Sequence, residues 1–182
     1  MGKEMKFIPY DPNKIEEIKQ LFTKTFSDSE GQSEGLVIGS LVYDLMTGTD
    51  GDDLYGFVAT ENQQIIGGIF FSRMTFENKV VAFILSPVAI KTSYQGKGIG
   101  QKLIEFGLNA LKEKGVELAF TYGDPNFYSK VGFSTIPEKL VKAPLPLTYP
   151  EGWLGQSFIG DEIEPITGNS HCVDALNKPE LW

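Results

Sequence analysis

The order of elements in the middle of the chain constrains the fold more than any other feature of the sequence. An apolar run at 79–90, KVVAFILSPVAI, predicts a strand buried on both faces. A glycine-rich loop and a segment with apolar residues three and four apart then predict a helix that ends at Gly115. A second strand is expected at 116–123, and two strands joined through a helix run parallel with a right-handed crossover. Four apolar side chains of the helix are expected to point inward: Ile99, Leu103, Phe106 and Leu111.

Pro87 interrupts the first of these two strands. Proline has no N–H group to donate to a sheet, so within a strand it marks an edge or a bulge. We therefore expect this strand to part from a neighbouring strand near Pro87.

The other predicted elements extend this core to a single α/β domain of 182 residues, with a less regular C-terminal extension from about 138. Asp-Pro pairs at 11–12 and 124–125 each provide a helix N-cap and a first helical residue. Pro and Gly within 138–155 predict a long surface excursion. The further elements are a strand at 6–10, a helix that buries Ile15, Ile18, Leu21, Phe22 and Phe26, a helix at about 34–46, a hairpin within 55–76 that turns at ENQ, a short helix at 126–132, and late strands at 133–137 and 157–163.

Composition excludes several classes of function. The formal charge of -8 and the isoelectric point near 4.7 argue against nucleic acid or an anionic membrane as partner, because both are usually bound by a basic surface. Cys172 is the only cysteine and His171 the only histidine, so the sequence offers neither an internal disulfide nor a Cys/His zinc site. No apolar run approaches the length of about 18 residues that spans a bilayer. These features predict a cytoplasmic protein that needs no metal.

The loop SYQGKGIG places Gly96, Gly98 and Gly100 where a helix begins, although a glycine inside a helix costs up to about 1 kcal/mol relative to alanine. A Walker loop requires Ser or Thr directly after its lysine, but Lys97 is followed by Gly98. A dinucleotide fingerprint requires tighter spacing to the strand and a later acidic residue that the sequence lacks. Two interpretations stay open. Backbone amides hold a pyrophosphate, with Lys91 and Lys97 adding positive charge, or a flexible loop merely lets the helix pack.

Two motifs that follow one another resemble the GNAT superfamily of acetyl-coenzyme A-dependent N-acetyltransferases. The first is a Val-Ala-Val-like triplet followed by Gln-x-x-Gly-x-Gly, and the second is Tyr-x-x-x-Gly-Phe. The matching residues are Val88, Ala89, Ile90, Gln95, Gly98 and Gly100 for the first motif and Tyr128, Gly132 and Phe133 for the second. The resemblance covers about 6–136, and GDPNFYSKVGF at 123–133 is most similar to a YhbS-like bacterial subgroup.

The resemblance implies a GNAT fold: a mixed, mostly antiparallel sheet with splayed parallel fourth and fifth strands, flanked by helices. The pantetheine arm of acetyl-CoA would lie in the gap, bonded to backbone like an added strand. The resemblance implies two groups of cofactor-binding residues, Val88, Ala89 and Ile90 beside the arm and Gln95, Gly96, Lys97, Gly98, Ile99 and Gly100 around the pyrophosphate. The side chains at 88–90 are equally typical of a core.

Tyr128 is the catalytic residue that the resemblance implies, as the acid that protonates the departing thiolate. The alternative is a half-buried aromatic residue with a solvated hydroxyl. The carboxylate base that many family members carry near the fourth strand has no counterpart in 79–90. Asp124 is a substitute, but its place before a proline predicts a helix cap, and Glu34 and Glu77 match in charge alone.

The sequence therefore predicts an acyltransferase that moves acetyl from acetyl-CoA to a primary amine by direct attack, without a metal or a covalent enzyme intermediate. The alternatives are a non-catalytic acyl-CoA binding or sensing module and an enzyme for longer acyl groups. The acceptor is expected to be a small-molecule or protein amine, with a slight preference for a cationic one because of the acidic composition. The C-terminal excursion is a candidate interface for a homodimer.

Overall fold

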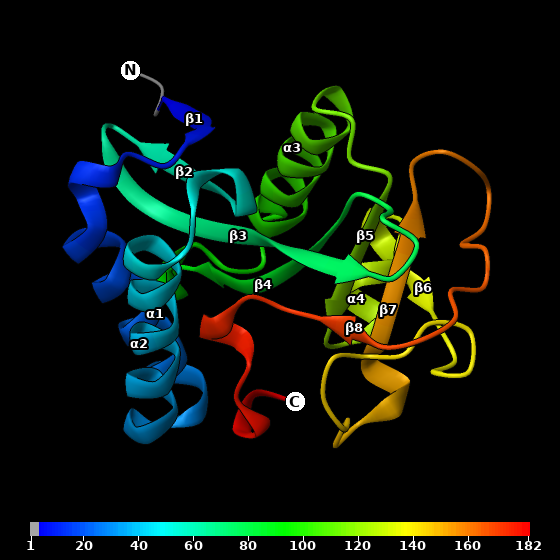
Figure 1. Cartoon of the computed structure of the whole chain (residues 1–182). Helices are drawn as coiled ribbons and strands as arrows, with labels where there is room; N and C mark the ends of the chain where they lie inside the picture. The colour runs from blue at the N-terminus through cyan, green and yellow to red at the C-terminus, as the bar shows by residue number, and fades with distance from the viewer. Residues whose placement is uncertain (1–3) are drawn as a thin grey trace. The chain divides into compact units, whose positions relative to one another are not determined.

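The structure is a computed structural model that describes residues 4–182 (Figure 1). The chain in it divides into two units. The first unit holds the chain up to Phe70 together with Pro87–Gly107, and the second holds Phe71–Ser86 together with Leu108–Trp182. Three elements contribute residues to both units: β3 (Gln64–Phe76), β4 (Ala82–Ile90) and α3 (Ile99–Glu113). The single domain expected from the sequence stays a prediction.

In the first unit the strand order is β1-β2-β3-β4, with β1 (Met5–Pro9) antiparallel to β2 (Leu54–Glu61). β2 and β3 form the hairpin predicted within 55–76. Its turn residues Asn62 and Gln63 have φ angles of 52° and 70°, the positive values that a tight two-residue hairpin turn requires. The hairpin prediction is confirmed, and the sequence ENQ sets its turn.

Two helices of the first unit, α1 (Ile15–Glu30) and α2 (Gln32–Gly48), lie side by side (Figure 1). Their close approach depends on a small residue, because a Cβ atom added at Gly35 would lie 2.6 Å from the carbonyl oxygen of Thr23. Four residues of α1 are buried, namely Ile18, Leu21, Phe22 and Thr25, whereas the predicted core residues Ile15 and Phe26 keep part of their surface exposed.

In the second unit the strand order is β3-β4-β5-β7-β6, and β8 (Ser170–His171) pairs with β3. β4 and β5 (Leu118–Tyr122) are parallel, from Ala82 opposite Leu118 to Leu85 opposite Thr121, as the connection through α3 predicts. β7 (Trp153–Ser157) lies antiparallel to both β5 and β6 (Ser134–Thr135). The sheet is therefore mixed and mostly antiparallel with one parallel pair, which is the predicted fold class.

Strand β7 corrects the sequence prediction. The surface excursion expected through 138–155 contains the start of this strand, and the segment 158–163, expected to continue a strand, is irregular. Trp153 is fully buried, stacks on the Phe120 ring with centroids 5.2 Å apart, and donates from Nε1 to the Val141 carbonyl at 2.9 Å. Burial of this indole beside β5 decides which segment becomes a strand.

Phe106 on α3 is a second correction, because 36% of its surface is exposed. Its ring contacts those of Phe7 and Phe57, with centroids 6.1 and 5.7 Å away, all within the first unit. Phe106 therefore lies over the β1–β2 edge of the sheet, and one side of its ring stays open to solvent. The other three residues predicted to point inward, Ile99, Leu103 and Leu111, are buried.

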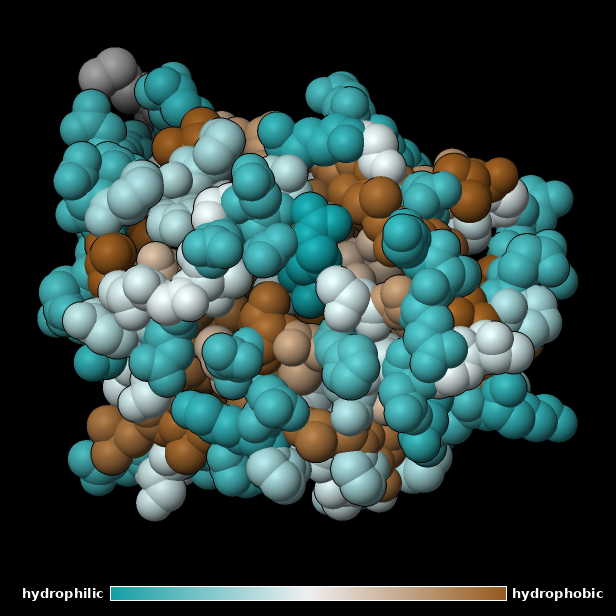
Figure 2. All heavy atoms as spheres, in the orientation of Figure 1, coloured by the Kyte–Doolittle hydropathy of each residue, from teal (hydrophilic) through white to brown (hydrophobic). Residues whose placement is uncertain are grey.

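The surface is mixed in polarity. On the face shown in Figure 2, hydrophobic residues emerge in separate groups between hydrophilic ones. The most exposed large apolar side chains are those of Leu36, Tyr149 and Ile159. Within residues 4–182, no helix has the length and apolar character needed to cross a membrane.

Candidate functional site

The parallel pairing of β4 with β5 ends at one rung, where Leu85 lies opposite Thr121. The Thr121 hydroxyl donates to the Leu85 carbonyl at 2.8 Å, so a side chain closes the ladder. β5 ends one residue later at Tyr122, whereas β4 continues to Ile90. Pro87, two residues beyond the rung, has no N–H group with which to extend the pairing. The two strands therefore part close to the proline that predicted their separation.

The last residues of β4 carry the predicted triplet. Ala89 is buried, and Val88 and Ile90 are partly exposed. Lys91 N donates to the Ile66 carbonyl at 2.8 Å, which keeps this end of β4 on β3. A strand has two hydrogen-bonding edges, so one edge holds β3 while the other is available to an extended ligand. Core packing by the side chains and binding by the backbone are therefore compatible here.

The glycine loop is open. Gly96 and Gly98 both have φ of +78°, a conformation that favours glycine, and a Cβ atom added at either would meet no other atom within 4 Å. α3 begins directly afterwards at Ile99, and Lys102 N donates to the Gly98 carbonyl at 3.2 Å. The amides that precede Lys102 in this first turn have no acceptor within their own helix. Exposed amides at a helix N-terminus form a site suited to an anion.

Gln95 links this loop to the end of β4. Its side-chain Nε2 donates to the Ile90 carbonyl at 2.9 Å, and its backbone N–H donates to the Thr92 carbonyl at 3.3 Å. The predicted cofactor residues 88–90 and 95–100 are thus held together within the first unit by a hydrogen bond that the motif itself does not reveal.

Tyr94 belongs to neither predicted motif, yet its ring contacts two lysines beside the glycine loop. The ammonium groups of Lys91 and Lys97 lie 5.9 and 5.3 Å from the centre of its ring. Its hydroxyl donates to Glu61 at 2.9 Å, and this bond raises the pKa of Tyr94. The ring therefore holds two cations next to the open glycine loop in a protein of formal charge -8.

Tyr128 ends the short helix α4 (Pro125–Tyr128) in the second unit. The Asp124 carboxylate accepts from Asn126 N at 2.9 Å, so Asp124 is the predicted cap. The Tyr128 ring makes edge contacts with Phe127 and Phe133, with centroids 5.0 and 5.9 Å away. A Cβ atom added at Gly123 would lie 2.7 Å from that ring, so the glycine makes room for it. These contacts fix the position of the phenol.

The Tyr128 hydroxyl keeps its proton at neutral pH. Burial raises the pKa of Tyr128 to about 12, although a hydrogen bond with the Thr121 side chain lowers it. The Thr121 side chain thus bonds to Tyr128 as well as to the Leu85 carbonyl. Tyr128 is therefore hydrogen-bonded to the rung where β4 and β5 part.

The other titratable candidates from the sequence do not form a catalytic group. His171 is exposed on β8, and Glu34 and Glu77 are exposed or partly exposed. Burial raises the pKa of the Cys172 thiol to about 11, so this cysteine is not a ready nucleophile at neutral pH. Within residues 4–182 no group of three His, Cys, Asp or Glu side chains is arranged to hold a metal ion.

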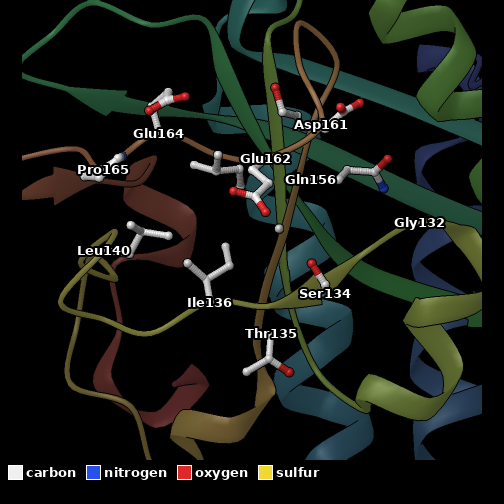
Figure 3. A pocket seen from close by; sticks show the side chains of 13 residues that line it. Gly132, Ser134, Thr135, Ile136, Leu140, Gln156, Asp161, Glu162, Glu164 and Pro165 are labelled. Atoms are coloured by element: carbon white, nitrogen blue, oxygen red, sulfur yellow. The ribbon is translucent and has the colours of Figure 1, made fainter.

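The second unit also contains a cavity of about 510 Å³ between β6, β7 and the segment that follows β7. Figure 3 shows Glu162 pointing into it from one side and Ile136 and Leu140 from the other. Asp161 and Glu164 also line it, and none of the predicted cofactor or catalytic residues does. Three carboxylates would repel a pyrophosphate, so this cavity is not the site for coenzyme A.

Comparison with known proteins agrees with the two motifs. The model of the acetyltransferase (GNAT) domain family matches residues 52–135. The uncharacterized N-acetyltransferase YjhQ of Escherichia coli (strain K12) is 27% identical over 170 residues, which cover 90% of each chain.

Two solved structures share the fold. The Escherichia coli GNAT protein YhbS, in complex with CoA, superimposes with a TM-score of 0.81 at 23% identity, over 98% of this chain and 94% of its own. A GNAT acetyltransferase of Brucella melitensis, in complex with acetyl-CoA, gives a TM-score of 0.71 at 24% identity, over 96% and 99%. The likeness to YhbS agrees with the predicted subgroup at the level of the fold. Residues 52–135 of this chain therefore match an acetyltransferase domain of the GNAT family, and the chain is similar to N-acetyltransferases over most of its length.

Proposed function

We propose that this protein transfers acetyl from acetyl-CoA to a primary amine by direct attack of the amine on the thioester. One observation carries the proposal: a strand with a free backbone edge leads directly into an open glycine loop at the start of α3. Extended backbone suits the amide-rich pantetheine arm, and free amides beside two lysines suit its pyrophosphate.

Acetyl-CoA fits the residues that are present. The backbone of Val88, Ala89 and Ile90 would hold the pantetheine arm, and the loop from Gln95 to Gly100 would hold the pyrophosphate. Both loop glycines with positive φ leave open space where a side chain would otherwise block the approach of a phosphate. Acetyl-CoA supplies the activated acetyl group, and the chain supplies position and a proton.

Tyr128 is the proposed acid. Its pKa of about 12 lies above that of an ordinary thiol, about 8.5, so complete proton transfer to a free thiolate is unfavourable by itself. Transfer becomes favourable overall because the attacking amine must lose a proton on becoming an amide. The amine releases this proton to water, and water returns a proton to the tyrosine. Tyr128 is therefore restored within the same cycle.

The acceptor must arrive as a neutral amine, because an ammonium group has no lone pair. β4 carries no carboxylate over Ala82–Ile90, so no strand residue is available to remove the proton there. We infer that the amine loses this proton to water before it attacks. The acceptor is a small-molecule or protein amine, and the cytoplasmic location and homodimer expected from the sequence stay predictions.

Calorimetry tests the cofactor assignment. Purified protein is titrated with acetyl-CoA and with CoA, beside the variants Gly98→Val and Gly115→Val. Both variants force a side chain onto a glycine of positive φ, +78° and +85°, with no atom within 4 Å, but only Gly98 lies in the loop. We expect Gly98→Val alone to lose binding. Equal binding by all three proteins would refute the loop assignment.

Turnover separates the enzyme from the alternative of a binding or sensing module. Tyr128→Phe should lower kcat about 100-fold while the Kd for acetyl-CoA stays within about twofold. Tyr149→Phe removes a hydroxyl from an exposed tyrosine and serves as the matched control. A catalyst that is unaffected by Tyr128→Phe would remove the phenol from the mechanism. Cofactor binding without transfer to any amine would favour the sensing module.

A further inference from the structure

A small second pocket opens beside the rung that ends the β4–β5 ladder. Its volume is about 40 Å³, and its lining residues are Ile84, Ser86, Tyr122, Leu176, Leu181 and Trp182, all of the second unit. A single water molecule needs about 10–15 Å³ of such space, so the pocket admits only a short alkyl group or the edge of one ring. The pocket therefore suits a small substituent rather than an extended chain.

The pocket lies on the face opposite the proposed acid. Ser86 and Tyr122 each directly follow a residue of the last rung, and successive side chains of a strand point to opposite faces. Thr121 points to the face of Tyr128, with which it is hydrogen-bonded. Tyr122 therefore points to the other face, as Ile84 and Ser86 do. A thioester beside this rung would have Tyr128 on one face and the pocket on the other.

The outer wall of the pocket is built from the segment 176–182 and is fixed in place. Only 5% of Trp182 is exposed, and its Nε1 donates to the Leu176 carbonyl at 2.8 Å. Its ring stacks on Tyr122, with centroids 5.8 Å apart and an angle of 18°. The Tyr122 hydroxyl in turn accepts from Tyr149 N at 2.7 Å. Both rings are thus held before any ligand arrives, which makes the wall a preorganised surface.

The six lining residues include no charged side chain. An ammonium group loses solvation in such surroundings, which lowers the pKa of an amine and favours its neutral form. The neutral form is the nucleophile that the reaction needs, and it is obtained here without a carboxylate base. A polycationic acceptor would have to leave further charges unsolvated near the same wall.

We infer that Leu176, Leu181 and Trp182 form the specificity wall for the acceptor, and that the acceptor is a primary amine with a small apolar or aromatic substituent. This inference rests on the proposed acetyl transfer and names its substrate class. It replaces the slight preference for a cationic acceptor that net charge alone gave.

The test compares benzylamine with spermidine as acceptors, using the wild type, Trp182→Ala, Leu181→Ala and Ile159→Ala. We expect a higher kcat/KM for benzylamine in the wild type. Trp182→Ala should lower that value about tenfold or more, since one apolar contact in a specificity pocket is worth about 10- to 200-fold. Leu181 is partly exposed, so Leu181→Ala keeps the test open if Trp182→Ala fails to fold. Ile159→Ala changes an exposed apolar residue outside the lining and should have no effect.

Calorimetry with acetyl-CoA distinguishes the two levels of failure. If the wild type does not bind acetyl-CoA, the proposed function fails and the inference fails with it. If the protein binds acetyl-CoA but prefers spermidine, or if both wall variants leave benzylamine kinetics unchanged, only the inference is overturned. Loss of benzylamine kcat/KM with an unchanged Kd for acetyl-CoA supports it.

Discussion

Replacing Thr121 with valine tests whether the hydrogen bond between Thr121 and Tyr128 orients the proposed acid. The side chain of Thr121 is fully buried, and valine has a similar shape but no hydroxyl. The substitution removes both the donor to the Leu85 carbonyl and the hydroxyl that is hydrogen-bonded to Tyr128. The phenol then keeps its ring contacts but loses this hydrogen bond.

The structure sets the size of both effects. A buried carbonyl deprived of a donor costs about 1–3 kcal/mol, and a methyl group in place of the hydroxyl returns about 0.8 kcal/mol through apolar burial. We expect a net loss of about 1 kcal/mol in the free energy of unfolding. General acid catalysis contributes about 10²- to 10⁴-fold in rate, and misorientation without removal should forfeit about tenfold of this in kcat.

Thr121→Ser is the matched control because it keeps the hydroxyl and loses a buried methyl group, which also costs about 1 kcal/mol. The two variants should therefore be similarly destabilised in urea, while only Thr121→Val loses kcat, with KM for acetyl-CoA unchanged in both. Wild-type kcat in Thr121→Val, or an equal loss of kcat in Thr121→Ser, would refute the positioning role.

Three further predictions follow from the same structure. Folding raises the pKa of Tyr128 to about 12, so its neutral form stabilises the protein fully below pH 10. This contribution is lost as the pH rises towards about 12. Tyr128→Phe should therefore flatten the alkaline fall in the free energy of unfolding, measured with urea. Because β4 carries no carboxylate, the pH at which kcat/KM levels off should follow the pKa of the acceptor, and a plateau that stays in place for two amines of different pKa would reveal an enzyme base. Gly35→Ala should lower the free energy of unfolding by about 2 kcal/mol or more, since the new methyl group would lie 2.6 Å from a backbone carbonyl of α1. Gly48→Ala is the control, because Gly48 ends α2, the helix that contains Gly35, and no other atom lies near it. It should leave stability unchanged or raise it by up to about 1 kcal/mol in thermal melts.

Most of the elements could be predicted from local signals in the sequence. Both Asp-Pro pairs act as caps, with Asp11 and Asp124 each accepting from a backbone N–H at 2.9 Å. The turn at ENQ and the parallel strands on either side of α3 also followed from local patterns. Strand β7 did not follow from a local pattern, because five residues are too few to show the alternation of buried and exposed side chains that is typical of a strand. Its burial depends on Phe120, a residue of a distant segment.

The residues of the candidate site likewise include some that local patterns predict and others that only the fold reveals. The motifs indicated Tyr128 and the glycine loop because those residues lie in fixed local spacing. The role of Tyr94 could not be predicted, because it depends on two lysines and Glu61 around one ring, and only the fold brings these residues together. The role of Thr121 could not be predicted either, because its hydroxyl reaches the Leu85 carbonyl only through the register of β4 and β5. The spacing of residues within one strand does not identify the residue that lies opposite on a neighbouring strand.

That register is the link between the proposed acid and the proposed acceptor pocket. With Leu85 opposite Thr121, the hydroxyl of Thr121 lies on the face of Tyr128 and the ring of Tyr122 lies on the face of Trp182. A shift of β5 by one residue would exchange these faces, because side chains alternate along a strand. The phenol would then meet an aromatic ring, and the pocket would lose the stacked wall. The buried run Ala82–Leu85 pairs with β5 and holds this register. It would therefore support the proposed reaction, although its own side chains include no acid or base.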